Sequence, residues 1–202
     1  MRSLRLARPG LIVAAASLLP CLAAPCRADP LVTDRPGIGS SPETVPLGTL
    51  QGEIGTDGTE IRFGLLPGAE VDHDDSGWAV KAQLFRDGKF SASGRLNYDG
   101  HVVGIEVPAS VSITPWASLA LDASWSRGGD VYAAGLGISP AQRLTLTPMI
   151  YHDGRFHAAI FTAWVVPGRD NMQVDIGFDQ DRINAGLSIA FDGGSIIHRL
   201  GV

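Results

Sequence analysis

The chain has 202 residues, a formal net charge of −5 and only 18% charged residues. That length suffices for one domain with a sizeable core, and the acidic balance disfavours nucleic acid, whose phosphates attract basic surfaces. After residue 28, no stretch holds the roughly 18 apolar residues that a transmembrane helix needs. The sequence contains no phosphate-cradling glycine loop, and no cofactor is expected.

Residues 1–28 have the organisation of a signal peptide. A basic start with three arginines precedes an apolar region, residues 11–24, that is too short to span a membrane, and we place cleavage after Ala28. Losing four arginines takes the formal charge of the chain from −5 to −9, and both cysteines leave with this segment. An exported chain without cysteine is not typical of a small disulfide-stapled domain, and it suits an outer-membrane protein.

Residues 101–127 show the pattern that the rest of the chain repeats. Apolar and polar side chains alternate from Val103 to Ile113 and, after Pro115, from Ala117 to Trp125. Because side chains alternate across a strand, this stretch predicts two strands, each with one apolar and one polar face. Tilted strands of about 9–11 residues are long enough to cross a bilayer.

The same alternation predicts an all-β chain, an antiparallel up-and-down transmembrane β-barrel of about 12 strands, with 10 as the alternative count because single-chain bacterial barrels have even numbers. Pairs such as Asp87-Gly88 and Asp99-Gly100 predict hairpins between the strands. The barrel is expected over residues 49–191, between an irregular segment at 29–48 and a tail at 192–202. Candidate strands are 49–55, 59–66, 69–74, 77–86, 89–98, 101–113, 116–126, 130–139, 142–151, 154–166, 170–178 and 182–191.

The character of the two faces decides which way they point. In a membrane barrel the apolar face meets lipid and the polar face lines the lumen. The expected lipid face includes Leu84, Leu121, Ile160, Ile189 and Phe191, and the aromatic girdles are expected at Trp78, Tyr98, Trp116, Trp125 and Tyr151. The expected lumen-lining residues are Lys81, Gln83, Lys89, Arg95, Asn97, Glu106, Asp122, Arg143, Asp175, Arg182 and Asn184. A soluble periplasmic sandwich or lipocalin-like barrel is the alternative, although its strands would be shorter.

The segment from Thr33 to Gly55 resembles the opening of a bacterial family of outer-membrane transporters that is named for the meta-pathway of phenol degradation. The residues that carry this resemblance are Thr33, Asp34, Arg35 and Pro36, then Glu43, Thr44, Val45 and Pro46, followed by Gly48, Gln51 and Glu53. The resemblance implies an outer-membrane β-barrel that transports small compounds, aromatic or hydrophobic ones among them.

These observations favour a transporter or narrow channel over an enzyme. An outer-membrane lipid hydrolase and a purely structural barrel are the alternatives, but no nucleophile-elbow motif is present. Asp72, His73, Asp74 and Asp75 form a weak candidate for a divalent-cation site, against the simpler interpretation of a solvated acidic turn. The expected partners are outer-membrane lipid, an unspecified small solute and, during biogenesis, the barrel assembly machinery.

The segment 29–48 contains Pro30, Pro36, Pro42 and Pro46. Proline cannot donate to a sheet interior, so this segment should not be a strand. We propose from the sequence that it folds into or across the lumen, with Asp34 and Arg35 bound to inward charges. A flexible leader that serves only export and assembly is the alternative.

Overall fold

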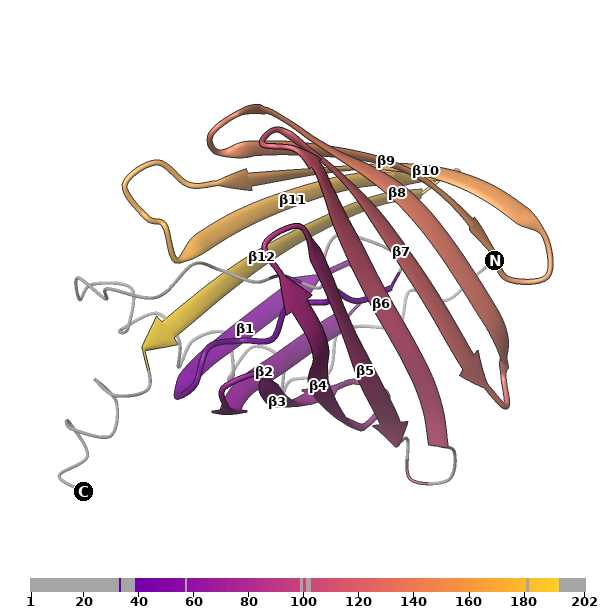
Figure 1. Cartoon of the computed structure of the whole chain (residues 1–202). Coiled ribbons are helices and arrows are strands. Elements are labelled where there is room, and N and C mark those ends of the chain that lie inside the picture. The colour runs from indigo at the N-terminus through magenta and orange to yellow at the C-terminus, as the bar shows by residue number, and fades with distance from the viewer. Residues whose placement is uncertain are drawn as a thin grey trace, which may run out of the picture.

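The computed structural model describes residues 33, 39–56, 58–98, 100, 103–180 and 182–192. Twelve strands form one closed antiparallel barrel in which sequence neighbours pair and β1 closes against β12 (Figure 1). The strands are β1 Thr49–Gly55, β2 Gly58–Leu66, β3 Ala69–Asp74, β4 Trp78–Asp87, β5 Phe90–Tyr98, β6 Val103–Thr114, β7 Ala117–Ser126, β8 Gly129–Ala141, β9 Leu144–His152, β10 Phe156–Val165, β11 Met172–Asp179 and β12 Arg182–Asp192.

The predicted fold class and the count of 12 strands are confirmed. Predicted strand ends lie within two residues of those observed, as where the predicted strand 101–113 is Val103–Thr114. Within the described ranges, no helix is long and apolar enough to cross a membrane. The predicted signal peptide, and the predicted tail beyond Asp192, lie outside the described residues.

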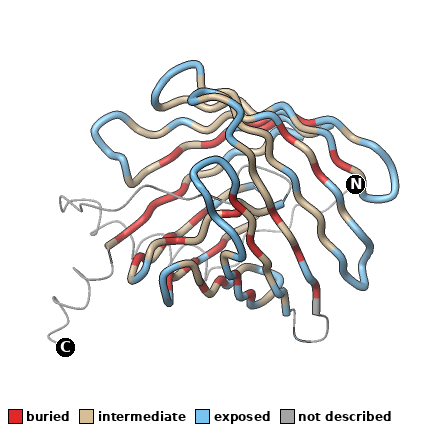
Figure 2. The backbone as a smooth tube through the Cα atoms, viewed as in Figure 1, coloured by how far each residue is buried: buried red, intermediate tan, exposed pale blue. Residues whose placement is uncertain are grey.

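Burial follows the alternation along each strand. Fully buried side chains include Arg62, Glu70 and Lys81, whereas Leu84 and Ile183 are about two-thirds exposed, at 68% and 66%. Figure 2 shows buried positions recurring along the strands between exposed ones. Charges inside and large apolar side chains outside are the reverse of a water-soluble barrel, and they are what a transmembrane barrel requires. The closed barrel excludes the soluble sandwich, and the exposed apolar face favours a transmembrane barrel over the lipocalin-like alternative.

Aromatic side chains are exposed near both ends of the barrel. We call the end where β1 begins and β12 ends the terminal end, and the opposite end the hairpin end. Aromatic belts at the two headgroup levels are typical of membrane barrels. The belt at the hairpin end contains Trp78, Tyr98, Trp125, Tyr132, Phe156 and Phe178, and the belt at the terminal end contains Phe85, Phe90, Trp116 and Trp164.

Three of the positions expected on the outer face are buried. Tyr151 is 6% exposed and lies inside, because it is in register with the inward Ala133 and His157; its assignment to an aromatic girdle was wrong. Ile189 and Phe191 are also buried, contrary to expectation. They lie opposite Met172 and Leu50, so apolar side chains gather where β12 meets its two neighbours.

The outer face of β7 provides a direct test of which side meets lipid. Leu121 lies in the middle of β7 and is 45% exposed, while Ser118 is half-buried on the inner face of the same strand. Leu121→Arg should lower the free energy of unfolding from vesicles by about 2–4 kcal/mol, because a charge at mid-bilayer has no water around it. Ser118→Arg should cost much less, since a lumen position can be hydrated. Equal losses in urea titrations of the two variants would show that the faces are reversed.

Candidate functional site

The first part of the site is a fully buried ion-pair cluster on β1–β4, which we call the Arg62 cluster. Nη2 of Arg62 lies 2.6 Å from Oε1 of Glu70, and its Nη1 lies 3.3 Å from Oε1 of Glu53. Nζ of Lys81 lies 2.9 Å from the same Glu70 oxygen. The register places Glu70 directly opposite Lys81, so the alternation of β3 and β4 turns both side chains inward. Buried charges are tolerated only when they are paired in this way.

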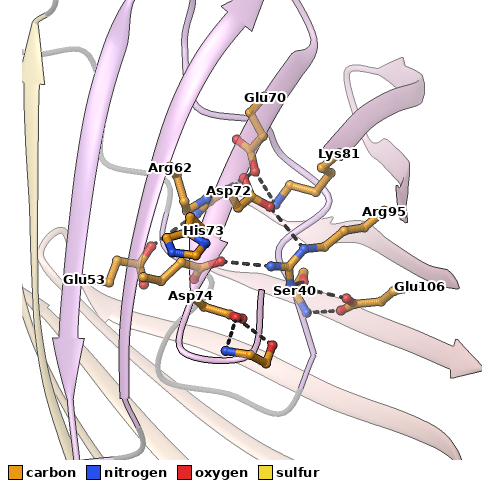
Figure 3. A network of polar contacts seen from close by, with 12 residues as sticks. Ser40, Glu53, Arg62, Glu70, Asp72, His73, Asp74, Lys81, Arg95 and Glu106 are labelled. Atoms are coloured by element: carbon orange, nitrogen blue, oxygen red, sulfur yellow. Dashed lines mark hydrogen bonds and ion pairs between the residues drawn. The ribbon is translucent and has the colours of Figure 1, made fainter. Parts of the chain in front are cut away.

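The second part is the Arg95 cluster, in which one guanidinium on β5 binds carboxylates from three other strands. Arg95 donates Nη2–H to Glu60 at 3.0 Å, Nε–H to Asp72 at 3.1 Å and Nη1–H to Glu106 at 3.5 Å. Figure 3 shows Asp72 and Glu106 converging on Arg95. The rigid fork of the guanidinium suits this role, because it presents five donors in one plane.

Residues 40–46 lie inside the barrel against both clusters, whereas Leu47 is 59% exposed. The backbone N–H of Ser40 donates to Glu106 at 2.8 Å and to Asp122 at 3.2 Å, and its hydroxyl accepts from Nη1 of Arg95 at 3.1 Å. Further along, the backbone N–H of the fully buried Val45 donates to Glu70. The segment therefore uses the acceptors that the strand charges leave available.

Two glycines allow this close approach. A Cβ at Gly64 would lie 2.0 Å from the carbonyl oxygen of Pro46, so β2 and the segment can be adjacent only because this position has no side chain. Gly48 N–H donates to Gly64 O at 2.8 Å, which fixes the segment against the wall. Gly39 has φ +95°, a left-handed conformation that glycine adopts readily, and a Cβ there would lie 2.5 Å from Cγ of Asp122.

The wall formed by β8–β11 has a different inner face. A small apolar cluster of Ala133, Tyr151, Ala159 and Phe161 occupies it. The ring of Phe161 lies over Gly177, where a Cβ would be 2.2 Å from its Cδ1. The inner face is thus charged along β1–β7 and mostly small or apolar along β8–β10.

A pocket of about 490 Å³ opens at the hairpin end of the barrel. Arg95 and Asn97 of β5 reach it from within, while Ser76 and Gly128 come from the hairpin turns. The pocket therefore leads from the hairpin end down to the Arg95 cluster, where Ser40 is also bound.

The structure brings part of the predicted lumen set together. Lys81, Arg95, Glu106 and Asp122 meet around residues 39–48. The buried Asp175 on β11 accepts from Nε2 of Gln173 at 2.7 Å. The other inward members of the set are half-buried: Gln83 beside Ser91, Asn97 in the pocket and Asn184 beside Thr56.

Three members of the predicted set lie at the rim of the barrel and not among the buried inner residues. Lys89 and Arg143 fall in turns, where the alternation of a strand no longer orients side chains, and Lys89 is exposed. Arg143 pairs with the exposed Asp170 at 2.6 Å. Arg182, the first residue of β12, is also exposed.

The sequence-based set omitted several residues of both clusters. Glu53, Glu60, Arg62 and Glu70 occupy alternate positions on β1–β3, between outward side chains such as Ile61. The signal that could have found them was therefore the same period of two, in strands that are short and rich in charge.

The four residues of the weak metal candidate make separate contacts. Asp72 binds Arg95 inside, whereas the ring of His73 stacks on Trp78 with centroids 4.4 Å apart. Oδ1 of Asp74 accepts from the backbone of its own turn, and Asp75 accepts from Thr59. Within the part of the chain that the structure describes, no group of three or more acidic, histidine or cysteine side chains could hold a metal ion.

The motif residues of the N-terminal segment are only partly described. Thr33 Oγ1 accepts from Gln173 at 2.9 Å, and Glu43 accepts from the Ser41 hydroxyl at 2.6 Å. Val45 is buried and Pro46 lies against Gly64, while Thr44 is half-buried. Asp34, Arg35 and Pro36 lie outside the described residues, so the proposed contacts of Asp34 and Arg35 stay a prediction.

An apolar outer face, two aromatic belts and a charged interior define the chain as a transmembrane β-barrel. No family model and no curated protein matches it. Among solved structures it is similar to KdgM porin, at 11% identity over 71% of this chain and 98% of that chain, with a TM-score of 0.49. KdgM porin in complex with disordered oligogalacturonate is similar at 12% identity, over 71% and 96%, with a TM-score of 0.48. A triple mutant of Rhodopseudomonas blastica porin is similar at 12% identity, over 67% and 54%, with a TM-score of 0.43.

Proposed function

We propose that this protein is an outer-membrane β-barrel that forms a narrow channel for small solutes. The observation that carries the proposal is a closed barrel whose outer face is apolar and whose interior is polar and contains a pocket. A closed wall leaves no unpaired strand edge in the bilayer, and a polar interior gives hydrophilic solutes a route that lipid does not.

The interior supports a narrow channel and not a wide pore. Residues 40 and 41, together with the two ion-pair clusters, occupy the space inside β1–β7 beside Arg95 and Lys81. The pocket at the hairpin end reaches this level. Solutes would therefore pass beside the segment, along the small side chains of β8–β10, or would need the segment to move.

The sequence features extend the proposal to location and solute. A signal peptide over residues 1–28 would deliver the chain for outer-membrane assembly by the barrel assembly machinery. The family resemblance around Thr33–Pro36 supports small compounds as the solutes, aromatic or hydrophobic ones among them. On this proposal the protein is a channel and not an enzyme.

Two measurements test the function. Heat-modifiable migration on a gel, from an outer-membrane fraction, is expected for a folded barrel. Purified protein in planar bilayers should then give discrete current steps. Recovery of native protein in the soluble periplasmic fraction without detergent would contradict the location. Hydrolysis of lipid or ester substrates that one Ser or His substitution abolishes, without any current, would favour the enzyme alternative.

A further inference from the structure

The fixed charges inside the barrel are predominantly negative. Apart from the first and last residue of each strand, the described inner positions carry seven carboxylates and four basic side chains, which leaves a formal charge of −3. The carboxylates are Glu53, Glu60, Glu70, Asp72, Glu106, Asp122 and Asp175, and the basic side chains are Arg62, Lys81, Arg95 and, opposite the buried Ser91, Arg86. We propose that the lumen selects cations over anions, an inference that rests on the proposed channel function.

Three of the four basic side chains are already bound to carboxylates. Arg62 binds both Glu53 and Glu70, and Lys81 also binds Glu70. Arg95 binds three carboxylates at once. An anion that entered the lumen would have to compete with these fixed carboxylates for Arg62, Lys81 and Arg95, whereas a cation would find carboxylate oxygens along the wall.

Two buried carboxylate oxygens have no hydrogen-bond partner among the residues described. They are Oδ1 of Asp72 and Oδ2 of Asp175, and both residues are about 1% exposed or less. A buried acceptor without a partner is costly, and a carboxylate charge that is not fully compensated adds negative potential to the lumen, which attracts cations.

The remaining charged groups do not reverse this sign. The described inner positions of β8–β11 contain no lysine or arginine, so no basic side chain of these strands offsets Asp175. Arg127 and Asp74 both line the pocket at the hairpin end and cancel in formal charge. Residues 34–38 contain one aspartate and one arginine and add no net charge.

The proposal is tested by reversal potentials in planar bilayers with asymmetric KCl. We expect the wild-type channel to pass K⁺ over Cl⁻ by at least roughly threefold, since a lumen lined by one sign of charge concentrates the opposite ion. Asp175→Asn, which keeps the shape of the side chain, should lower that permeability ratio about twofold. Asp130→Asn removes the same charge from an exposed position outside the lumen and should leave the ratio unchanged.

The possible outcomes separate the two claims. A current with equal permeability or anion preference would overturn cation selectivity and leave the channel function intact. Absence of any current from folded, heat-modifiable protein would overturn the channel function itself. If Asp175→Asn fails to fold, Asp122→Asn provides the same charge change on β7, and an unchanged ratio in the folded variant would overturn the inference.

Discussion

Arg95→Met is expected to destabilise the barrel by about 3–5 kcal/mol, because it leaves buried carboxylates without their shared cation. Arg95 binds Glu60, Asp72 and Glu106, and all three carboxylates are buried. Methionine keeps most of the length of the side chain, so the lost packing is small compared with the lost charge. The measurement is equilibrium unfolding in urea of the protein in detergent micelles, followed by tryptophan fluorescence.

Arg143→Met is the matched control for this variant. Its side chain is 39% exposed and binds a single exposed carboxylate, Asp170, so the loss should stay below about 1 kcal/mol. A second variant separates charge from packing: Glu60→Gln and Asp72→Asn added to Arg95→Met should restore part of the stability, because they remove two of the stranded charges. Equal losses in Arg95→Met and Arg143→Met, or no restoration, would contradict this account of the cluster.

The fold was predictable because a barrel strand is specified locally. Alternation from Val103 to Ile113 marks a strand by itself, and Asp-Gly pairs mark the hairpins between strands. Even the short strand at 69–74 was placed correctly, since its Glu70 and Asp72 alternate with Val71 and His73. In an up-and-down barrel each strand pairs with its sequence neighbours, so the topology required no long-range information beyond closure.

The candidate site was less accessible, because its contacts depend on register and on distance across the lumen. Arg95 was predicted to point inward, but its partners come from β2, β3 and β6, and Glu60 lies 35 residues away in sequence. Alternation indicates the face on which a side chain lies, not its height along the barrel axis. The rim positions Lys89, Arg143 and Arg182 illustrate the same limit, since beyond a strand the period of two has no meaning.

The sequence and the structure together are most informative about the segment at 29–48. Proline content excluded a strand, and the charges expected around it included Arg95, Glu106 and Asp122. These three side chains do bind the segment, through Ser40. The alternative of a leader that serves only export and assembly does not account for the burial of Val45 against Glu70.

Deleting residues 30–46 from the mature chain is expected to raise single-channel conductance severalfold and to lower the melting temperature. Conductance should rise because the deletion empties the space beside Arg95 and Lys81 that residues 40 and 41 now occupy. Stability should fall because the buried Glu70 and Glu106 lose backbone donors, at about 1–3 kcal/mol for each acceptor that water does not reach. Planar-bilayer recordings and thermal unfolding in micelles measure the two effects.

A point variant tests the same segment without removing it. The Cβ atom introduced by Gly64→Val would lie 2.0 Å from the carbonyl oxygen of Pro46. The clash is with backbone and not with a flexible side chain, so it cannot be relieved by a rotamer change. The segment should therefore leave the wall, and conductance should rise as in the deletion. Gly52→Val is the matched control, because no atom lies within 4 Å of a Cβ at that position of β1. Unchanged conductance and unchanged melting in both the deletion and Gly64→Val would exclude residues 39–48 as a plug.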